Sequence, residues 1–439
     1  MHSGRHIAFF VSLSDRFIGE ACVSESPTVP LTTADGVPLK TSLRRAVRRS
    51  KVKAFLLVSP LLLFLVIAFV MPIFDMLWRS VDNPEVSSTL PRTVAALEGW
   101  DGESIPGEPV FAALVEDLRV GQEARNLGLL SSRLNYEKSG MRSAISRTAR
   151  RVGSLEPPYR ESLIGLNEAW GELDTWKLIK RESSPYTVSY YLAAVDRQLT
   201  PDGEIVKVPE YLQIHATLFW RTFWMSAVIT AMTLVLGYPI AFLLANLPLR
   251  HSNLLMILVL LPFWTSLLVR TTTWIAILQS QGVLNDMMVA IGVIADEARW
   301  QMIHNKLGTI IAMTHILLPF MILPLYSVMK TIPPSYMRAA RSLGGRPFLS
   351  FRRVYFPLTI PGIAAGGILV FILSIGYYIT PALVGGQSGR FITNYIAYHM
   401  QTSLNWGLAA AIASILLFVV IVFYWIFNRL IGVDKVKLG

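Results

Sequence analysis

The chain has 439 residues, of which 53% are hydrophobic and 16% charged, and this composition is too apolar for a soluble protein. Its net charge of +11 could indicate a nucleic-acid-binding protein, but the distribution of the charge excludes nucleic acid as a partner. The segment from Arg79 to His215 contains 20 acidic residues against 16 Lys plus Arg, a net of −4, so the rest of the chain carries +15 in short segments beside apolar runs.

Residues 1–43 are polar and interrupted by proline and glycine, and we expect a disordered cytoplasmic tail. The next segment, residues 44–78, combines a basic flank with an apolar run at 54–74. About 20 apolar residues suffice to cross a bilayer, and flanking cations favour the cytoplasmic side. The sequence therefore predicts a first membrane span with a cytoplasmic amino terminus. The single Cys22 excludes an intramolecular disulfide.

Residues 79–215 form a hydrophilic segment between the first and second apolar runs. Apolar residues recur at helical spacing in 110–120 and in 159–178, so we expect a mostly helical insertion domain. Four arginines at 142, 147, 150 and 151 form a basic patch, which we interpret as a solvated helix face. Because one span precedes this segment, it is predicted to be extracytoplasmic.

Residues 216–439 contain the remaining apolar runs. We predict five more spans, at 219–247, 254–278, 307–329, 363–384 and 408–427. A cytoplasmic amino terminus then places the basic turn at Arg250, the loop 330–362 and the carboxy terminus in the cytoplasm as well. The fold class predicted is all-α integral membrane, with six spans and both termini cytoplasmic.

The loop between the fourth and fifth spans is basic, with arginines at 338, 341, 346, 352 and 353 and no acid between 335 and 363. Pro333 and Pro334 predict a short helix from Ser335 to Leu343, which Gly344 and Gly345 end. A second helix can begin at Pro347, and Pro357 and Pro361 mark the entry into the next span. The positive-inside rule alone would also explain a basic loop here.

The small residues and prolines of this loop resemble the Glu-Ala-Ala motif of ATP-binding-cassette importer permeases of the type I fold. Ala339-Ala340, Gly344 and the Val354–Pro357 stretch fall at the matching positions, while Arg338 stands where the family usually has Glu. The resemblance implies a coupling helix that docks in a separate ATPase subunit. The ATPase-coupling residues it implies are Arg338, Ala339, Ala340, Gly344, Gly345, Pro347 and Pro357.

Two further stretches resemble the spermidine/putrescine branch of these permeases. They are Pro262–Ser266 with Arg270 and Trp274, continuing to Asn285, and Thr380–Gly386 with Asn405-Trp406. The resemblance covers roughly 54–74 and 219 to the end, and it implies import of a polyamine across a bacterial inner membrane. The alternatives are another small organic solute or ion for the same class of permease, or a secondary transporter.

Aromatic side chains are the candidates for the path of a cationic solute, because aromatic faces hold alkylammonium groups with about 0.5–2 kcal/mol each. The substrate-path residues expected are Trp264, Arg270, Trp274, Tyr377, Tyr378 and Thr380. The two tyrosines would equally suit an interfacial aromatic belt. Arg270 repels a polyamine, so we interpret it as a packing or gating residue, or as a snorkelling cation.

No catalytic or metal motif is found. The chain has no Gly-Lys dipeptide, which excludes a Walker A loop, and no His followed by Glu; His2 and His6 have ligand-like spacing but no third ligand. We therefore expect a transport subunit that is no enzyme and binds no cofactor, with ATP and Mg on the partner ATPase. The other partners expected are a second permease subunit, an extracytoplasmic solute-binding protein and membrane lipid. A secondary transporter would need ionisable residues within spans, and Arg270 is the only formal charge well inside one, with His315 as the other titratable candidate.

Overall fold

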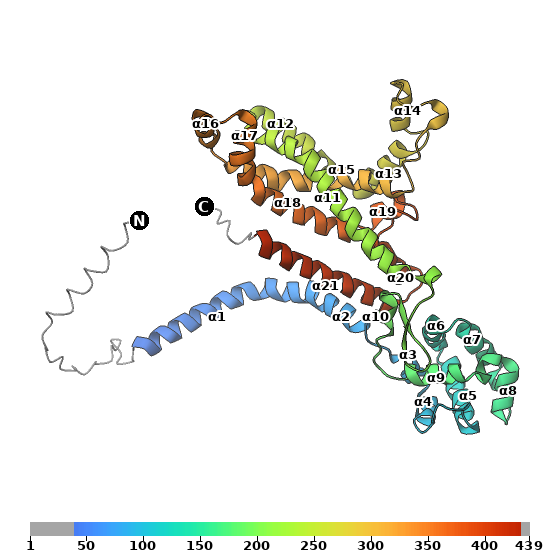
Figure 1. Ribbon diagram of the computed structural model, residues 1–439. Helices are drawn as coiled ribbons and strands as arrows, with labels where there is room; N and C mark the ends of the chain where they lie inside the picture. Colours follow the sequence, from blue (N-terminus) through green and yellow to red (C-terminus); the bar gives the residue numbers. More distant parts are fainter. Residues whose placement is uncertain (1–38, 432–439) are drawn as a thin grey trace, which may run out of the picture. The chain divides into compact units, whose positions relative to one another are not determined.

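The computed structural model describes residues 39–431 and divides the chain into two units, Met1–Ile73 and Phe74–Gly439 (Figure 1). Residues 1–38 of the predicted disordered tail lie outside the described residues, and so do the His2–His6 pair and Cys22. Residues 39–43, which the prediction also assigned to the tail, are helical. The described chain is mostly helical, as predicted. Five of its helices are long and apolar enough to cross a membrane, or six if one bent pair counts as a span.

The described part of the first unit, from residue 39 on, is a continuous helix that carries the first predicted span. Helix α1 (Leu39–Leu65) passes through a π-helical turn at Val66–Val70 into α2 (Met71–Arg79), whose last residues belong to the second unit. Phe55, Leu57 and Phe64 are 60% or more exposed, and such side chains on a helix of this length are suited to a lipid environment.

In the second unit, the hydrophilic segment folds into short helices around its own core. Phe111, Trp170 and Trp176 are fully buried there, and Trp176 donates a hydrogen bond from Nε1 to the Trp170 carbonyl at 3.0 Å. The bounds of the helices are α3 (Pro84–Thr89), α4 (Pro91–Leu97), α5 (Glu108–Glu123), α6 (Leu127–Glu137), α7 (Met141–Arg151), α8 (Tyr159–Leu166), α9 (Leu173–Glu182) and α10 (Ser189–Ala194).

The helical spacing predicted helix α5 correctly, but the helix expected over 159–178 is wrong as one element. It is divided into α8 and α9 by a 3-10 turn at Glu168–Gly171, where Asn167 accepts a hydrogen bond from the Ala169 amide. The break lets Trp170 enter the core while the chain turns. The four arginines of the predicted basic patch are exposed, as expected for a solvated face.

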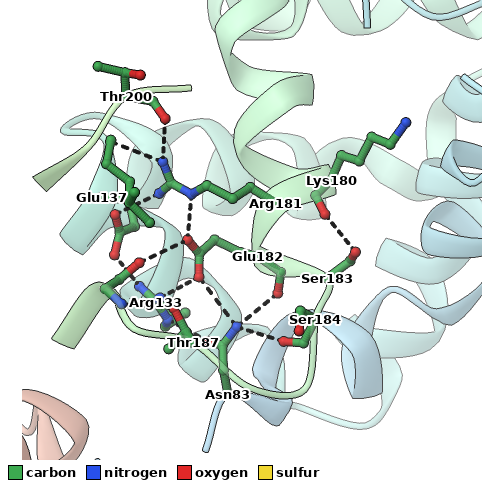
Figure 2. Close-up of polar contacts among 12 residues, drawn as sticks. Asn83, Arg133, Glu137, Lys180, Arg181, Glu182, Ser183, Ser184, Thr187 and Thr200 are labelled. Carbon is green, nitrogen blue, oxygen red and sulfur yellow. Dashed lines mark hydrogen bonds and ion pairs between the residues drawn. The ribbon is translucent and has the colours of Figure 1, made fainter. Parts of the chain in front are cut away.

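A buried ion network ties α3, α6 and α9 together (Figure 2). The Arg133 guanidinium, 2% exposed, pairs with Glu182, with Glu137 at 2.8 Å and with the Asn83 Oδ1 at 2.7 Å. Arg181 contacts the same two carboxylates, at 2.7 Å and 2.8 Å. Two cations thus face two anions, and the desolvation cost of each is offset by hydrogen bonds.

A two-stranded antiparallel hairpin follows, in which β1 (Arg197–Leu199) pairs with β2 (Ile205–Lys207). It leads to α11 (His215–Asn246), the second apolar helix. The Asp196 carboxylate caps this helix, accepting from the amides of Ile214, His215 and Ala216 at 2.8–3.2 Å. A carboxylate at a helix start is favoured because it satisfies free amides and the helix dipole.

The apolar helices α11, α15 and α18 pack against one another and form the core of the membrane region (Figure 1). Small residues permit this contact: a Cβ added at Gly366 of α18 would lie 2.8 Å from the Met321 Sδ of α15. The remaining bounds are α12 (Leu249–Leu260), α13 (Leu267–Leu278), α14 (Val283–Ala290), α15 (Lys306–Thr331), α16 (Pro334–Ser342), α17 (Pro347–Ser350), α18 (Phe356–Gly376), α19 (Ile379–Val384), α20 (Ile392–Gln401) and α21 (Trp406–Ile431).

Two predicted spans need correction. The span expected at 254–278 is broken between Trp264 and Leu267, where the helix pair bends by 97°. The Ser266 side chain accepts a hydrogen bond from the Val269 amide and starts a new helix there. The span expected at 363–384 instead runs over Pro347–Gly376 and ends before Tyr377, so Pro357 and Pro361 lie inside a continuous helix, not at its entry.

Candidate functional site

The basic loop forms the short helix that the sequence predicts. Helix α16 spans Pro334–Ser342 and ends in two glycines whose amides bond back to the carbonyls of Arg341 and Ala340, at 3.0 and 3.1 Å. Gly344 has a φ of +83°, which favours glycine, and has open space around it. Gly345 is crowded, because an added Cβ would lie 2.7 Å from the Ala340 carbonyl oxygen. Glycine is therefore favoured at 344 by the backbone conformation and required at 345 by the lack of space.

The outer surface of this loop combines exposed apolar groups with unpaired cations. Leu343 and Phe348 are 89% and 75% exposed, and Tyr336 is half exposed. All five arginines of the loop are exposed, and none forms an ion pair with a described residue. Ala339 is exposed too, so a second protein could approach the helix backbone closely. Monomeric surfaces rarely leave such groups together without a binding partner.

Three of the six predicted path residues, Arg270, Trp274 and Tyr377, lie around His315 of α15. Trp274 donates a hydrogen bond from Nε1 to the His315 Nδ1 at 3.2 Å, and the two rings meet edge to face with centroids 5.2 Å apart. The charge of Arg270 acts on both His315 and Tyr377. The Arg270 Nε is buried and has no hydrogen-bond partner among the described residues. We call Arg270, Trp274, His315 and Tyr377 the outer cluster.

The other three predicted path residues are placed differently. Thr380 is buried beside the outer cluster, with its Oγ1 3.1 Å from the Thr271 Oγ1. Tyr378 lines a separate cavity of about 580 Å³, together with Tyr395 and Tyr398 of α20. Trp264 is 77% exposed at the helix break, and its side chain makes no hydrogen bond or ring contact with a described residue. The structure thus divides the predicted path into a cluster, a cavity and an outlying residue.

The chemistry available at these places is binding, by aromatic faces, hydroxyls and amides. Over their stated bounds, α11, α12, α13, α15, α18 and α21 contain no Asp or Glu, so a cation bound among them would find no counter-ion there. No group of three or more His, Cys, Asp or Glu that could hold a metal is found among residues 39–431.

A polar junction that sequence reasoning missed joins the hydrophilic segment to the apolar helices. The His215 Nδ1 lies 2.9 Å from the Asp196 carboxylate, and the His399 Nδ1 lies 2.9 Å from the Ser403 hydroxyl. The Tyr136 hydroxyl of α6 donates to the Ser403 carbonyl at 2.6 Å. Burial of the ring, and to a smaller extent the nearby charge of His215, lower the pKa of His399 to about 4. His215 and Asp196 are 19 residues apart and Tyr136 and Ser403 are 267 apart, so no local pattern signals these two pairs, whereas His399 and Ser403 are only four residues apart.

In a comparison with known proteins, one family model matches a stretch of this chain that includes both the basic loop and the outer cluster. The family described as "Binding-protein-dependent transport system inner membrane component" matches residues 237–431. The spermidine/putrescine transport system permease protein PotB of Haemophilus influenzae is 35% identical over 228 residues, which cover 51% of this chain and 79% of the relative. The Escherichia coli protein of the same name is 36% identical over 217 residues, covering 49% and 78%.

Among solved structures, the chain aligns with a bacterial alginate ABC transporter, at a TM-score of 0.41. That crystal structure contains the transporter in complex with an alginate pentasaccharide-bound periplasmic protein. The sequence identity is 17%, and the alignment covers 51% of this chain and 80% of that chain. The hydrophilic segment 79–215 lies outside the residues of the family match.

Proposed function

We propose that this chain, which belongs to the family of binding-protein-dependent transport system inner membrane components, is the permease subunit of an ATP-driven importer of a polyamine. It is a multi-pass inner-membrane transport component. The polyamine is supported by the two spermidine/putrescine permeases that are 35–36% identical over nearly four fifths of their length.

The observation that carries the proposal is the exposed surface of the basic loop. Leu343 and Phe348 project from a helix–turn–helix whose geometry two glycines fix, on a chain that has no Walker A sequence of its own. We infer that this surface docks in a separate ATPase subunit, which binds the ATP and Mg. Closure of the ATPase dimer would then move α16, and α18 would carry that motion into the membrane because the chain is helical from Pro347 to Gly376.

The remaining partners follow from the same assignment. A second permease subunit would complete the pathway, and an extracytoplasmic solute-binding protein would deliver the solute. We place both termini and the basic loop in the cytoplasm, which puts residues 79–215 outside. There the insertion would contact the binding protein or flank its docking surface. Deleting residues 85–210 should then lower maximal uptake without changing solute preference.

One observation favours a second candidate solute. Among the described residues the buried Nε of Arg270 has no hydrogen-bond partner, and α11, α12, α13, α15, α18 and α21 contain no acid over their stated bounds. A solute that carries an anionic group would satisfy Arg270, whereas a polyamine would be held by aromatic faces and by any carboxylates that the second permease supplies. Uptake of labelled spermidine, with unlabelled polyamines and small organic anions as competitors, separates the two. Competition by anions alone would refute the polyamine assignment.

The coupling step is tested by two glycine variants that differ in structural cost. Gly345→Ala forces a Cβ to within 2.7 Å of the Ala340 carbonyl, so it should distort the turn and uncouple ATP hydrolysis from uptake. Gly344→Ala meets no atom and carries only the cost of a positive φ, about 1 kcal/mol, so it should couple nearly normally. Equal, wild-type coupling in both variants would argue against ATPase docking at this turn.

A further inference from the structure

A groove of about 980 Å³ lies between the hydrophilic segment and the loop that precedes the last apolar helix, all within the second unit. Its walls come from α6 and the start of α7 on one side and from residues 402–407 on the other. The Tyr136 hydroxyl bonds across it to the Ser403 carbonyl at 2.6 Å, so the two walls are held together. Neither the family match nor the predicted pathway explains this groove.

The lining of the groove is cationic although the segment that supplies most of it is net acidic. Four arginines line it, at 79, 125, 133 and 142. Arg133 is committed to its buried carboxylates, and Arg79 pairs with Asp75 at 2.8 Å. Arg125 and Arg142 are exposed and form no ion pair with a described residue, although Arg142 donates to the Ser132 hydroxyl at 2.9 Å.

The lining contains one acid beside these arginines. Glu85 has a buried Oε2 that finds no hydrogen-bond partner among the described residues. Burial raises the pKa of Glu85, which favours its neutral form. Arg125 and Arg142, which form no ion pair with a described residue, outnumber this one acid at the groove, and their guanidinium groups suit an oxyanion with several acceptor oxygens.

The position of the groove along the chain fixes its depth relative to the membrane. Trp406 and Gly407, which line it, begin the apolar helix α21, and Arg79 ends the apolar helix that starts at Leu43. Residues at such helix ends lie at the level of the lipid headgroups. The rim is apolar: Leu129 and Leu404 are 69% and 64% exposed and Trp406 is 42% exposed. A cationic centre with an apolar rim at headgroup depth matches a lipid better than an acidic protein surface.

We propose that this groove binds the phosphate-bearing headgroup of an anionic phospholipid. Arg125 and Arg142 hold the phosphate oxygens, while Leu129, Leu404 and Trp406 cover the first carbons of the lipid. Bound there, the lipid contacts both walls of the groove and so stabilises the hydrophilic segment against the last apolar helix. The proposal is independent of the solute that the chain transports.

The test titrates the purified full-length protein, in a neutral detergent, with phosphatidylglycerol, phosphatidylcholine or inorganic phosphate. Lipid retention by native mass spectrometry and the midpoint of thermal unfolding are the readouts. We expect phosphatidylglycerol to bind and to raise the midpoint, while phosphatidylcholine and phosphate do neither. The double variant Arg125→Gln/Arg142→Gln should bind phosphatidylglycerol roughly 10- to 30-fold more weakly, since each surface cation contributes on the order of 1 kcal/mol.

A matched control is available on the same helix as Arg142. Arg147 and Arg150 of α7 are exposed but do not line the groove, so Arg147→Gln/Arg150→Gln removes the same charge and should leave binding unchanged. Equal weakening in both double variants would reduce the effect to net charge and overturn the proposal. Phosphate acting as well as phosphatidylglycerol would overturn the lipid as ligand. The lipid would also be overturned as ligand if the variant Arg125→Gln/Arg142→Gln kept its lipid affinity but lost stimulation by the solute-binding protein. The groove would then dock a protein.

Discussion

Replacing Arg133 with methionine should destabilise the hydrophilic segment by about 3–5 kcal/mol, the usual cost of removing one partner from a buried ion pair. The guanidinium is 2% exposed and Glu182 is 1% exposed, so water cannot take its place. Without it, Arg181 alone faces both Glu137 and Glu182, and the Asn83 Oδ1 loses its donor at 2.7 Å. Methionine fills a similar volume, so the cost is electrostatic and not that of a cavity.

Native-state hydrogen exchange of the full-length protein measures this cost directly. Because 1.36 kcal/mol is a factor of ten, amide protection in α6 and α9 should fall at least 100-fold in Arg133→Met. Glu172→Gln is the control, since it breaks the exposed pair with Lys138 and should cost under about 1 kcal/mol. Adding Glu182→Gln to Arg133→Met should recover part of the loss by restoring one cation to one anion. A loss in Arg133→Met no larger than that of the control would refute the reasoning.

Three further outcomes are expected. Burial raises the pKa of Glu85 above its usual 4.5, so Glu85→Gln should stabilise the fold near neutral pH, and urea titrations should show the gain vanish below that value, where the acid is protonated in both states. The lowered pKa of His399, about 4, means that the unfolded chain binds its proton first, so stability should fall as pH drops from 6.5 towards 4. His399→Phe should flatten that dependence in thermal unfolding, and an unchanged slope would assign it elsewhere. Cysteines at the exposed Ser139 and Ser342, in a cysteine-free background, should react with impermeant reagents from opposite sides of the membrane, and labelling of both from one side would contradict the six-span topology.

Local patterns in the sequence were sufficient for the features that depend on neighbouring residues. The apolar runs, together with the family assignment, confirm the all-α integral membrane fold expected for a type I importer permease. The proline pair and the glycine pair predicted helix α16 to within one residue at each end, because helix ends are set by local backbone chemistry.

Hydropathy could not locate the helix ends within the apolar runs. The 97° bend beside Ser266 and the helix end before Tyr377 both lie inside runs that are predicted from the sequence as single spans, at 254–278 and 363–384. Contacts between residues far apart in the chain could not be predicted from hydropathy either. The pairing of Trp274 with His315 joins residues 41 apart, and only the fold brings Arg270 close to them. The roles of the predicted coupling and path residues stay predictions.

The cap that Asp196 places on α11 couples the hydrophilic segment mechanically to a membrane helix, so that the two should move together. Three backbone amides and the His215 ring bond to one carboxylate, so α11 cannot turn about its axis without carrying β1 along or breaking all four bonds. The Tyr191 hydroxyl, 2.8 Å from Ser80 and 2.9 Å from Ser414, makes a similar attachment to α21. A fluorophore pair, one on this segment and one on the basic loop, would therefore report the transport cycle from sites that leave the solute's route untouched.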